Sequence, residues 1–152
     1  MYELALFAGG GGGLLGSKLL GWKTVCYVEN NKYCCEIIKA RIKDGLLEDA
    51  PIWDNVATFD GHAWAGAVDI VSAGFPCQPF STAGHMRAGR DERNLWPETI
   101  RVIEEVRPGW CLLENVPGLL AGRHGYFAQI LLDLARRGFT ARWGCLPAAA
   151  VG

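Results

Sequence analysis

Five consecutive glycines, Gly9–Gly13, constrain the fold of this chain more than any other feature of its sequence. An apolar segment, Leu4–Phe7, precedes them and Leu14–Leu20 follows, so the order predicts a strand, a tight turn and a helix. Glycine loses more conformational freedom on folding than any other residue, so such a run is destabilising unless the backbone needs that freedom. We expect the turn to let the backbone approach a ligand closely.

The glycine turn also fits a nucleotide-binding fingerprint. Gly11-x-Gly13-x-x-Gly16 has the required spacing, and Glu29 comes at the end of a second predicted strand, residues 23–28. An acid in that place accepts hydrogen bonds from the hydroxyls of a ribose. On this pattern alone, NAD, FAD and S-adenosylmethionine are all suitable ligands.

Strand and helix patterns alternate along the rest of the chain. We expect further strands near Ile52 and at 68–73, 110–113 and 140–146, and helices at 31–43, 97–106 and 126–137. The alternation predicts an α/β fold with a mostly parallel sheet and helices on both faces. In such sheets ligands bind beyond the carboxyl ends of the strands, where the glycine turn, Glu29 and Glu114 fall. A length of 152 residues predicts one domain, 1–152.

Charge and cysteine spacing argue against several classes of protein. The net charge is -1, which argues against the broad basic face of a protein that holds a polyanion by charge alone. The six cysteines include no Cys-x-x-Cys pair, so we expect no metal site and mostly small buried thiols. No apolar run reaches the ~20 residues that span a bilayer, and Met1–Glu3 carries no basic leader. We therefore expect a cytoplasmic protein without membrane contact.

A loop rich in proline follows the predicted strand at 68–73. It reads Phe75-Pro76-Cys77-Gln78-Pro79-Phe80-Ser81, and its two prolines end any further ladder pairing. A cysteine held between Pro76 and Gln78 at a strand end is partly exposed and rigidly presented, as a nucleophile requires.

With these residues in view, the chain resembles the DNA cytosine-5 methyltransferase family. Phe7–Gly12 is similar to the family's first motif, Gly74–Ser81 contains its Pro-Cys-Gln motif intact, and Glu114-Asn115-Val116 is its Glu-Asn-Val motif, all in the family's order. The resemblance covers essentially the whole chain. It implies a Rossmann-like, S-adenosylmethionine-dependent methyltransferase fold and methyl transfer to C5 of cytosine in double-stranded DNA. The biological setting that it implies is restriction-modification or phage DNA modification.

The resemblance also implies a role for individual residues. Cys77 would add to C6 of cytosine, Glu114 would protonate or hydrogen-bond N3, and the cytosine would be flipped out of the duplex. Asp54 would accept a hydrogen bond from the adenine amino group of the cofactor, although Asp60 is a rival by spacing. In full, the implied sets are Cys77, Glu114, Pro76 and Asn115 for catalysis; Phe7, Ala8, Gly9, Gly11, Gly12, Glu29, Asn30, Asp54 and Leu95 for the cofactor; and Gln78, Ser81, Arg87 and Arg90 for DNA.

Family members continue with a Gln-x-Arg-x-Arg motif, a target-recognition region and a final helix, none of which this sequence contains. We therefore expect a fold that is incomplete at its C-terminus and duplex DNA binding that is weak or absent. Two alternatives stay open at this point: a Rossmann-type flavin or nicotinamide oxidoreductase with Cys77 as a redox thiol, and the non-catalytic half of a split methyltransferase. The sequence leaves the oligomeric state open.

Overall fold

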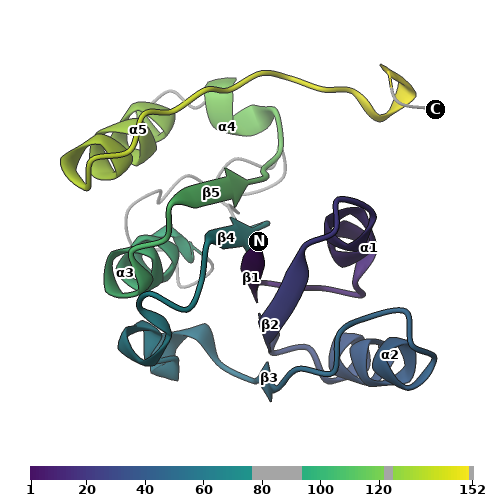
Figure 1. Ribbon diagram of the computed structural model, residues 1–152. Coiled ribbons are helices and arrows are strands. Elements are labelled where there is room, and N and C mark those ends of the chain that lie inside the picture. The colour runs from purple at the N-terminus through teal and green to yellow at the C-terminus, as the bar shows by residue number, and fades with distance from the viewer. Residues whose placement is uncertain (77–93, 122–124, 151–152) are drawn as a thin grey trace. The chain divides into compact units, whose positions relative to one another are not determined.

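The structure, a computed structural model, describes residues 1–76, 94–121 and 125–150 (Figure 1). The described chain falls into two compact units. The first comprises Met1–Pro76 and Leu95–Glu114, and the second comprises the rest.

The first unit is built on a five-stranded sheet. The strands are β1 (Tyr2–Leu6), β2 (Lys23–Val28), β3 (Ile52–Trp53), β4 (Ile70–Ala73) and β5 (Trp110–Leu113). Their order is β3-β2-β1-β4-β5, and every neighbouring pair is parallel. The predicted parallel α/β fold is confirmed.

Helices pack on both faces of this sheet. In Figure 1, α1 (Gly12–Leu19) and α2 (Lys32–Lys43) lie on one side and α3 (Trp96–Val106) lies on the other. The start of α2 is fixed by Asn31, whose side chain accepts hydrogen bonds from Tyr33 N and Cys34 N. Pro97 lies in the first turn of α3, as predicted, where a missing backbone N–H costs nothing.

Apolar side chains fill the layers on either side of the sheet. On the side of α1 and α2, one buried cluster contains Ala5, Leu14, Tyr27, Ile38 and Leu47. On the other side, α3 buries an apolar stripe with the spacing of a helix: Ile100, Val102, Ile103 and Val106. Burial of this apolar surface is the main force that holds the sheet and its helices together.

One acid lies inside this core. Glu3 on β1 is fully buried, and its carboxylate accepts hydrogen bonds from the hydroxyls of Ser17 (2.8 Å), Thr24 (2.8 Å) and Ser72 (2.6 Å). These donors come from α1, β2 and β4, so one side chain joins four elements. A buried carboxylate is tolerated only when its oxygens are satisfied in this way.

The second unit contains α4 (Gly118–Ala121), α5 (Tyr126–Arg136) and a short 3-10 helix, η4 (Ala148–Ala150). The strand predicted at 140–146 is wrong, because those residues have no regular secondary structure. Trp143 packs edge-on against Phe127 of α5, with ring centroids 5.5 Å apart. Aromatic and β-branched residues favour strands only where a neighbouring strand offers a ladder and a surface to pack on. None of the helices in the described ranges is both long and apolar enough to cross a membrane.

Candidate active site

The predicted site residues lie where the parallel strands end. The chain runs outward from β1 through β2 to β3 and then returns to β4 on the other side of β1. Ligands of open parallel sheets bind at such a reversal of strand order, beyond the carboxyl ends. Five predicted or flanking residues follow those ends directly: Phe7, Glu29, Asp54, Gly74 and Glu114.

The glycine turn after β1 has a backbone that favours glycine. Phe7, Gly9 and Gly11 have φ angles of 55°, 57° and 89°, all in the left-handed region. That conformation is strained for Phe7, and strain of this kind clusters at functional sites. A Cβ added at Gly12 or Gly13 would meet no atom of the described residues within 4 Å.

The same turn begins α1. Gly11 is its N-cap, no side chain caps the helix, and its first turn has no acid. The N–H groups at such an end carry a partial positive charge and bind anionic groups. The turn can therefore hold a carboxylate or phosphate against its backbone.

Glu29, which directly follows β2, holds the glycine turn through its side chain. Its side chain is almost buried, with 8% exposed. One carboxylate oxygen accepts a hydrogen bond from Gly9 N and the other from Asn31 N, both at 2.7 Å. Each oxygen keeps a second lone pair, so the carboxylate can also accept from ribose hydroxyls. Asn30, the next predicted residue, is exposed.

The structure separates the two candidate acids after β3. Trp53 O accepts a hydrogen bond from Glu29 N (2.9 Å), so Asp54 follows a strand end that adjoins Glu29. Asp54 is exposed, and no described residue donates a hydrogen bond to its carboxylate. Asp60 instead caps the 3-10 helix η2 (Gly61–Trp64), because its Oδ1 lies 3.0 Å from both His62 N and His62 Nδ1. These bonds, led by the backbone one, lower the pKa of Asp60, whereas Asp54 stays the predicted partner of the adenine.

Glu114 lies beside the chain that leads to the predicted nucleophile. Its N–H donates to Ala73 O at the end of β4 (2.9 Å). A Cβ added at Gly74 would lie 3.4 Å from Glu114 Oε2, so the absence of a side chain there leaves room for the carboxylate. Pro76 O accepts from Leu95 N (3.4 Å), which brings Leu95 to the same strand end.

The remaining predicted residues are Asn115 and a group that lies outside the described ranges. Asn115, in the second unit, accepts a hydrogen bond from Val116 N (2.9 Å). The nucleophile and the four DNA-contacting residues lie outside the described residues: Cys77, Gln78, Ser81, Arg87 and Arg90. Their roles stay predictions.

Three of the described cysteines, Cys26, Cys35 and Cys111, make poor rivals to Cys77. Burial raises the pKa of Cys26 to about 11 and that of Cys111 to about 12, and it also raises the pKa of Cys35. These thiols stay neutral near pH 7, whereas a nucleophile must ionise. The expectation that most cysteines are buried is wrong for the described part, where only Cys26 is buried and Cys145 is exposed.

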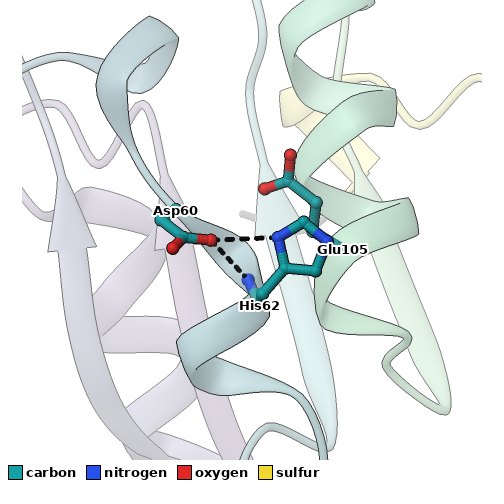
Figure 2. Close-up of side chains that lie close together, drawn as sticks. All are labelled: Asp60, His62 and Glu105. Carbon is teal, nitrogen blue, oxygen red and sulfur yellow. Dashed lines mark hydrogen bonds and ion pairs between the residues drawn. The ribbon is translucent and has the colours of Figure 1, made fainter.

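Asp60, His62 and Glu105 bring potential metal-ligand atoms within 4.8 Å of one another (Figure 2). The carboxylate of Glu105, however, is already held by Arg101, at 2.8 and 2.9 Å. The adjoining hollow of about 470 Å³ is lined by His62, Ala65, Arg101, Glu104, Glu105 and Arg107. A cation there would compete with a guanidinium for the same oxygens, so the cluster is a structural contact between η2 and α3.

Arg101 is the residue of this region that the sequence analysis missed. It lies on α3 and forms ion pairs with Glu98 (2.8 Å) and Glu105 (2.8 Å). The spacing Glu98-x-x-Arg101-x-x-x-Glu105 is visible in the sequence and is typical of helix ion pairs. Its contacts with the chain after β3, in contrast, join residues more than 40 positions apart.

Together, the parallel order of the five strands and the helices on both faces define a Rossmann-like fold. More specifically, this chain belongs to the C-5 cytosine-specific DNA methylase family, whose model matches residues 1–152. The resemblance inferred from the motifs is confirmed. The oxidoreductase alternative is not consistent with membership of this family.

Curated relatives agree with this family, and solved structures share the fold. The chain is 35% identical over 151 residues to the type II methyltransferase M.NgoMIV of Neisseria gonorrhoeae, covering 99% of this chain and 47% of that protein. It is 37% identical over 134 residues to M.PspPI of a Psychrobacter species, covering 85% of this chain and 30% of the relative. The fold matches a prophage-encoded DNA modification methyltransferase of E. coli with a TM-score of 0.69, at 24% identity over 90% of this chain and 38% of that one. It also matches a DNMT2 mutant of Spodoptera frugiperda with a TM-score of 0.63, at 22% identity over 87% of this chain and 40% of that one. The chain thus spans about half, or less, of the length of these proteins.

Proposed function

We propose that the whole protein transfers a methyl group from S-adenosylmethionine to C5 of cytosine in DNA, and that this chain supplies its cofactor-binding and catalytic portion. The observation that carries the proposal is the gathering of the glycine turn, Glu29, Asp54 and Glu114 at neighbouring carboxyl ends of one parallel sheet. The relationship to type II methyltransferases supports it.

The residues present fit the proposed cofactor. The uncapped start of α1 suits the carboxylate of its methionine part, and Glu29 keeps free lone pairs for its ribose hydroxyls. Asp54 suits the adenine amino group, while Phe7 and Leu95 would contact the adenine. The remaining backbone contacts fall to Ala8, Gly9, Gly11, Gly12 and Asn30. When bound, S-adenosylmethionine supplies an electrophilic methyl group.

The chain's own residues would prepare the cytosine ring. Cys77, as a thiolate, forms a bond from its sulfur to C6, and Glu114 places a proton at N3, which takes up the electron pair displaced into the ring. C5 is thereby made nucleophilic. Once C5 carries the methyl group, loss of its proton to a base would expel the thiolate, N3 would return its proton to Glu114, and the aromatic ring would be restored. Pro76 and Asn115 support these two groups, and the hydrogen bond between Pro76 O and Leu95 N holds the start of the loop that carries Cys77.

The DNA substrate requires further contacts. C6 of a stacked cytosine is out of reach, so the base must be flipped out of the duplex. We assign contacts with the flipped strand to Gln78, Ser81, Arg87 and Arg90. With a net charge of -1, the chain has little capacity for counterion release, so tight duplex binding depends on these local contacts and on the rest of the whole protein. The relationship to type II methyltransferases supports a setting in restriction-modification, with phage DNA modification as the alternative.

The experiment that tests the proposal measures tritiated methyl incorporation into duplex DNA by the whole protein. We expect label at C5 of cytosine, lost in Cys77→Ser and reduced by orders of magnitude in Glu114→Gln. A Cys145→Ser variant is the matched control, since that thiol is exposed, and it should keep full activity. Label on an exocyclic amino group, or full activity in Cys77→Ser, would contradict the proposal.

A further inference from the structure

The chain that follows β3 carries the acid proposed for the adenine. Asp54 is followed by two 3-10 helices, η1 (Val56–Thr58) and η2. Short exposed segments of this kind are poorly ordered unless other elements hold them. The position of Asp54 therefore depends on what fixes residues 53–61.

Local side chains fix the two residues next to Asp54. Trp53 Nε1 donates to Thr58 Oγ1 (3.2 Å), and that hydroxyl donates in turn to Asn55 O (3.1 Å). The Asn55 side chain accepts from Ala57 N (2.9 Å). Both neighbours of Asp54 are thus tied to η1, while the Asp54 carboxylate itself receives no hydrogen bond from the described residues.

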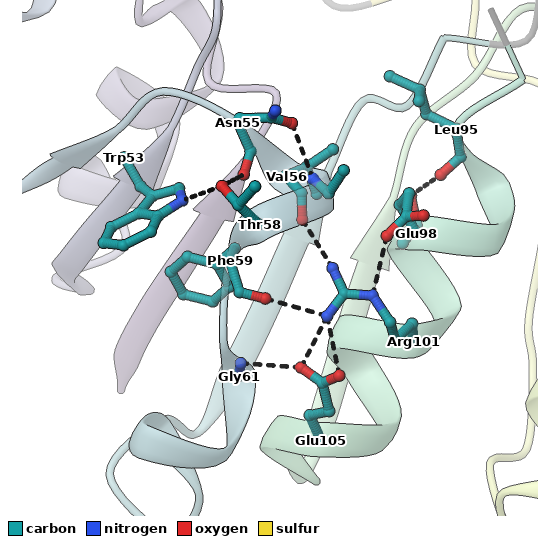
Figure 3. A network of polar contacts seen from close by, with 12 residues as sticks. Trp53, Asn55, Val56, Thr58, Phe59, Gly61, Leu95, Glu98, Arg101 and Glu105 are labelled. Atoms are coloured by element: carbon teal, nitrogen blue, oxygen red, sulfur yellow. Dashed lines mark hydrogen bonds and ion pairs between the residues drawn. The ribbon is translucent and has the colours of Figure 1, made fainter. Parts of the chain in front are cut away.

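Arg101 of α3 fixes η1 from outside (Figure 3). Its Nη2 donates to Val56 O (2.7 Å) and its Nη1 to Phe59 O (3.0 Å), so one guanidinium holds the carbonyls on both sides of η1. The guanidinium is held in turn by Glu98 and Glu105. A planar fork with five donors can satisfy all of these acceptors together, whereas the ammonium of lysine can reach only some of them.

Glu105 completes the attachment. Its Oε2 accepts a hydrogen bond from Gly61 N (2.8 Å). A Cβ at Gly61 would lie 2.9 Å from Glu105 Cβ and 3.1 Å from Val106 Cγ2, so α3 and the start of η2 are in direct contact. The backbone from Val56 to Gly61 is therefore anchored to α3 at three points.

We propose that Arg101 is a positioning residue for the cofactor's adenine, acting through η1 on Asp54. This inference rests on the proposed function, because it takes the adenine of S-adenosylmethionine as the partner of Asp54. A purely structural arginine affects stability alone. As a positioning residue, Arg101 also determines how strongly the site prefers a purine with an amino group over one with a carbonyl.

The experiment titrates the whole protein with S-adenosylhomocysteine and with S-inosylhomocysteine, in which a carbonyl oxygen replaces the adenine amino group. The wild type should prefer the first ligand by tenfold or more, roughly the value of one hydrogen bond to a charged group. In Arg101→Lys the preference should fall toward one. Ile103→Val, a buried change on the same helix, is the matched control and should keep the wild-type preference even where it lowers the melting temperature.

A double-mutant cycle completes the test. Asp54→Asn should abolish the preference, and adding Arg101→Lys to it should change the preference no further. If the wild type binds the ligands but Arg101→Lys leaves the preference unchanged, this inference alone is wrong. If the wild type binds neither ligand, the proposed function is wrong as well. If Arg101→Lys does not fold, Glu105→Gln is tested in its place. The ligand preference should then fall about twofold. An unchanged preference in Glu105→Gln would contradict the inference.

Discussion

Replacing Glu29 by glutamine tests whether this carboxylate holds the glycine turn. Its two oxygens accept one backbone hydrogen bond each, from Gly9 and from Asn31, at 2.7 Å. Glutamine has the same shape but only one acceptor oxygen, and its NH₂ group would face a backbone N–H. One of the two bonds is therefore lost, at a site that is 8% exposed.

The expected loss of stability follows from that count. A hydrogen bond to a charged group contributes about 1.5–3 kcal/mol, and leaving a buried donor unpaired adds to the cost of losing it. Glu29→Gln should therefore lower the free energy of unfolding by about 2 kcal/mol or more. With a urea dependence of about 1–3 kcal/mol per M, the midpoint should fall by about 1 M.

Urea unfolding followed by tryptophan fluorescence measures this shift, since the chain has six tryptophans. Glu36→Gln is the matched control: Glu36 lies on α2 and pairs with Lys39 at 2.7 Å, but the two side chains are 70% and 60% exposed. Such exposed pairs contribute little, so the control should unfold close to the wild type. Equal midpoints for the two variants would refute the structural role assigned to Glu29.

Two further changes test the packing and the thiols. Gly61→Ala places a Cβ 2.9 Å from Glu105 Cβ and should lower the free energy of unfolding by about 1–3 kcal/mol. Gly16→Ala, at a helical site with no described atom within 4 Å, should raise it by about 1 kcal/mol. Equal effects of the two changes in thermal unfolding would contradict the close contact at Gly61. Because burial raises the pKa of Cys26 to about 11 and of Cys111 to about 12, from an ordinary value of 9.0, the unfolded chain loses these protons first. Their contribution to stability should be complete below about pH 9 and be lost as the pH rises toward 11 and 12, and Cys26→Ala should weaken this alkaline loss in urea titrations.

The strand ends were the most predictable part of the site. Local signals placed them: the glycine run after β1, Glu29 after β2 and Glu114 after β5 all mark points where an apolar run stops. Because parallel strands share one carboxyl edge, knowing the ends was enough to predict which residues gather there. The capping role of Asp60 on η2 could not be read from its spacing, and the assignment of the adenine to Asp54 stays a prediction.

Other features depended on partners far along the chain. Thr140–Leu146 has strand-like composition but no strand to pair with in the described part of the chain, so its local preference had no effect. The ion pairs of Arg101 with Glu98 and Glu105 were visible as a spacing on one helix. Its hydrogen bonds to Val56 and Phe59 were not visible, because they depend on how α3 packs against residues more than 40 positions away in the sequence.

The buried carboxylate of Glu3 limits how this protein can be shortened. Its shortest hydrogen bond comes from Ser72, 69 positions later, and the other two come from within the first 24 residues. Any fragment that stops before β4 would keep the acid and lose that donor, leaving a charge to be buried with too few partners. We therefore expect that the segment before β4 does not fold by itself, and that a shortened form of the protein must keep β4 to be stable.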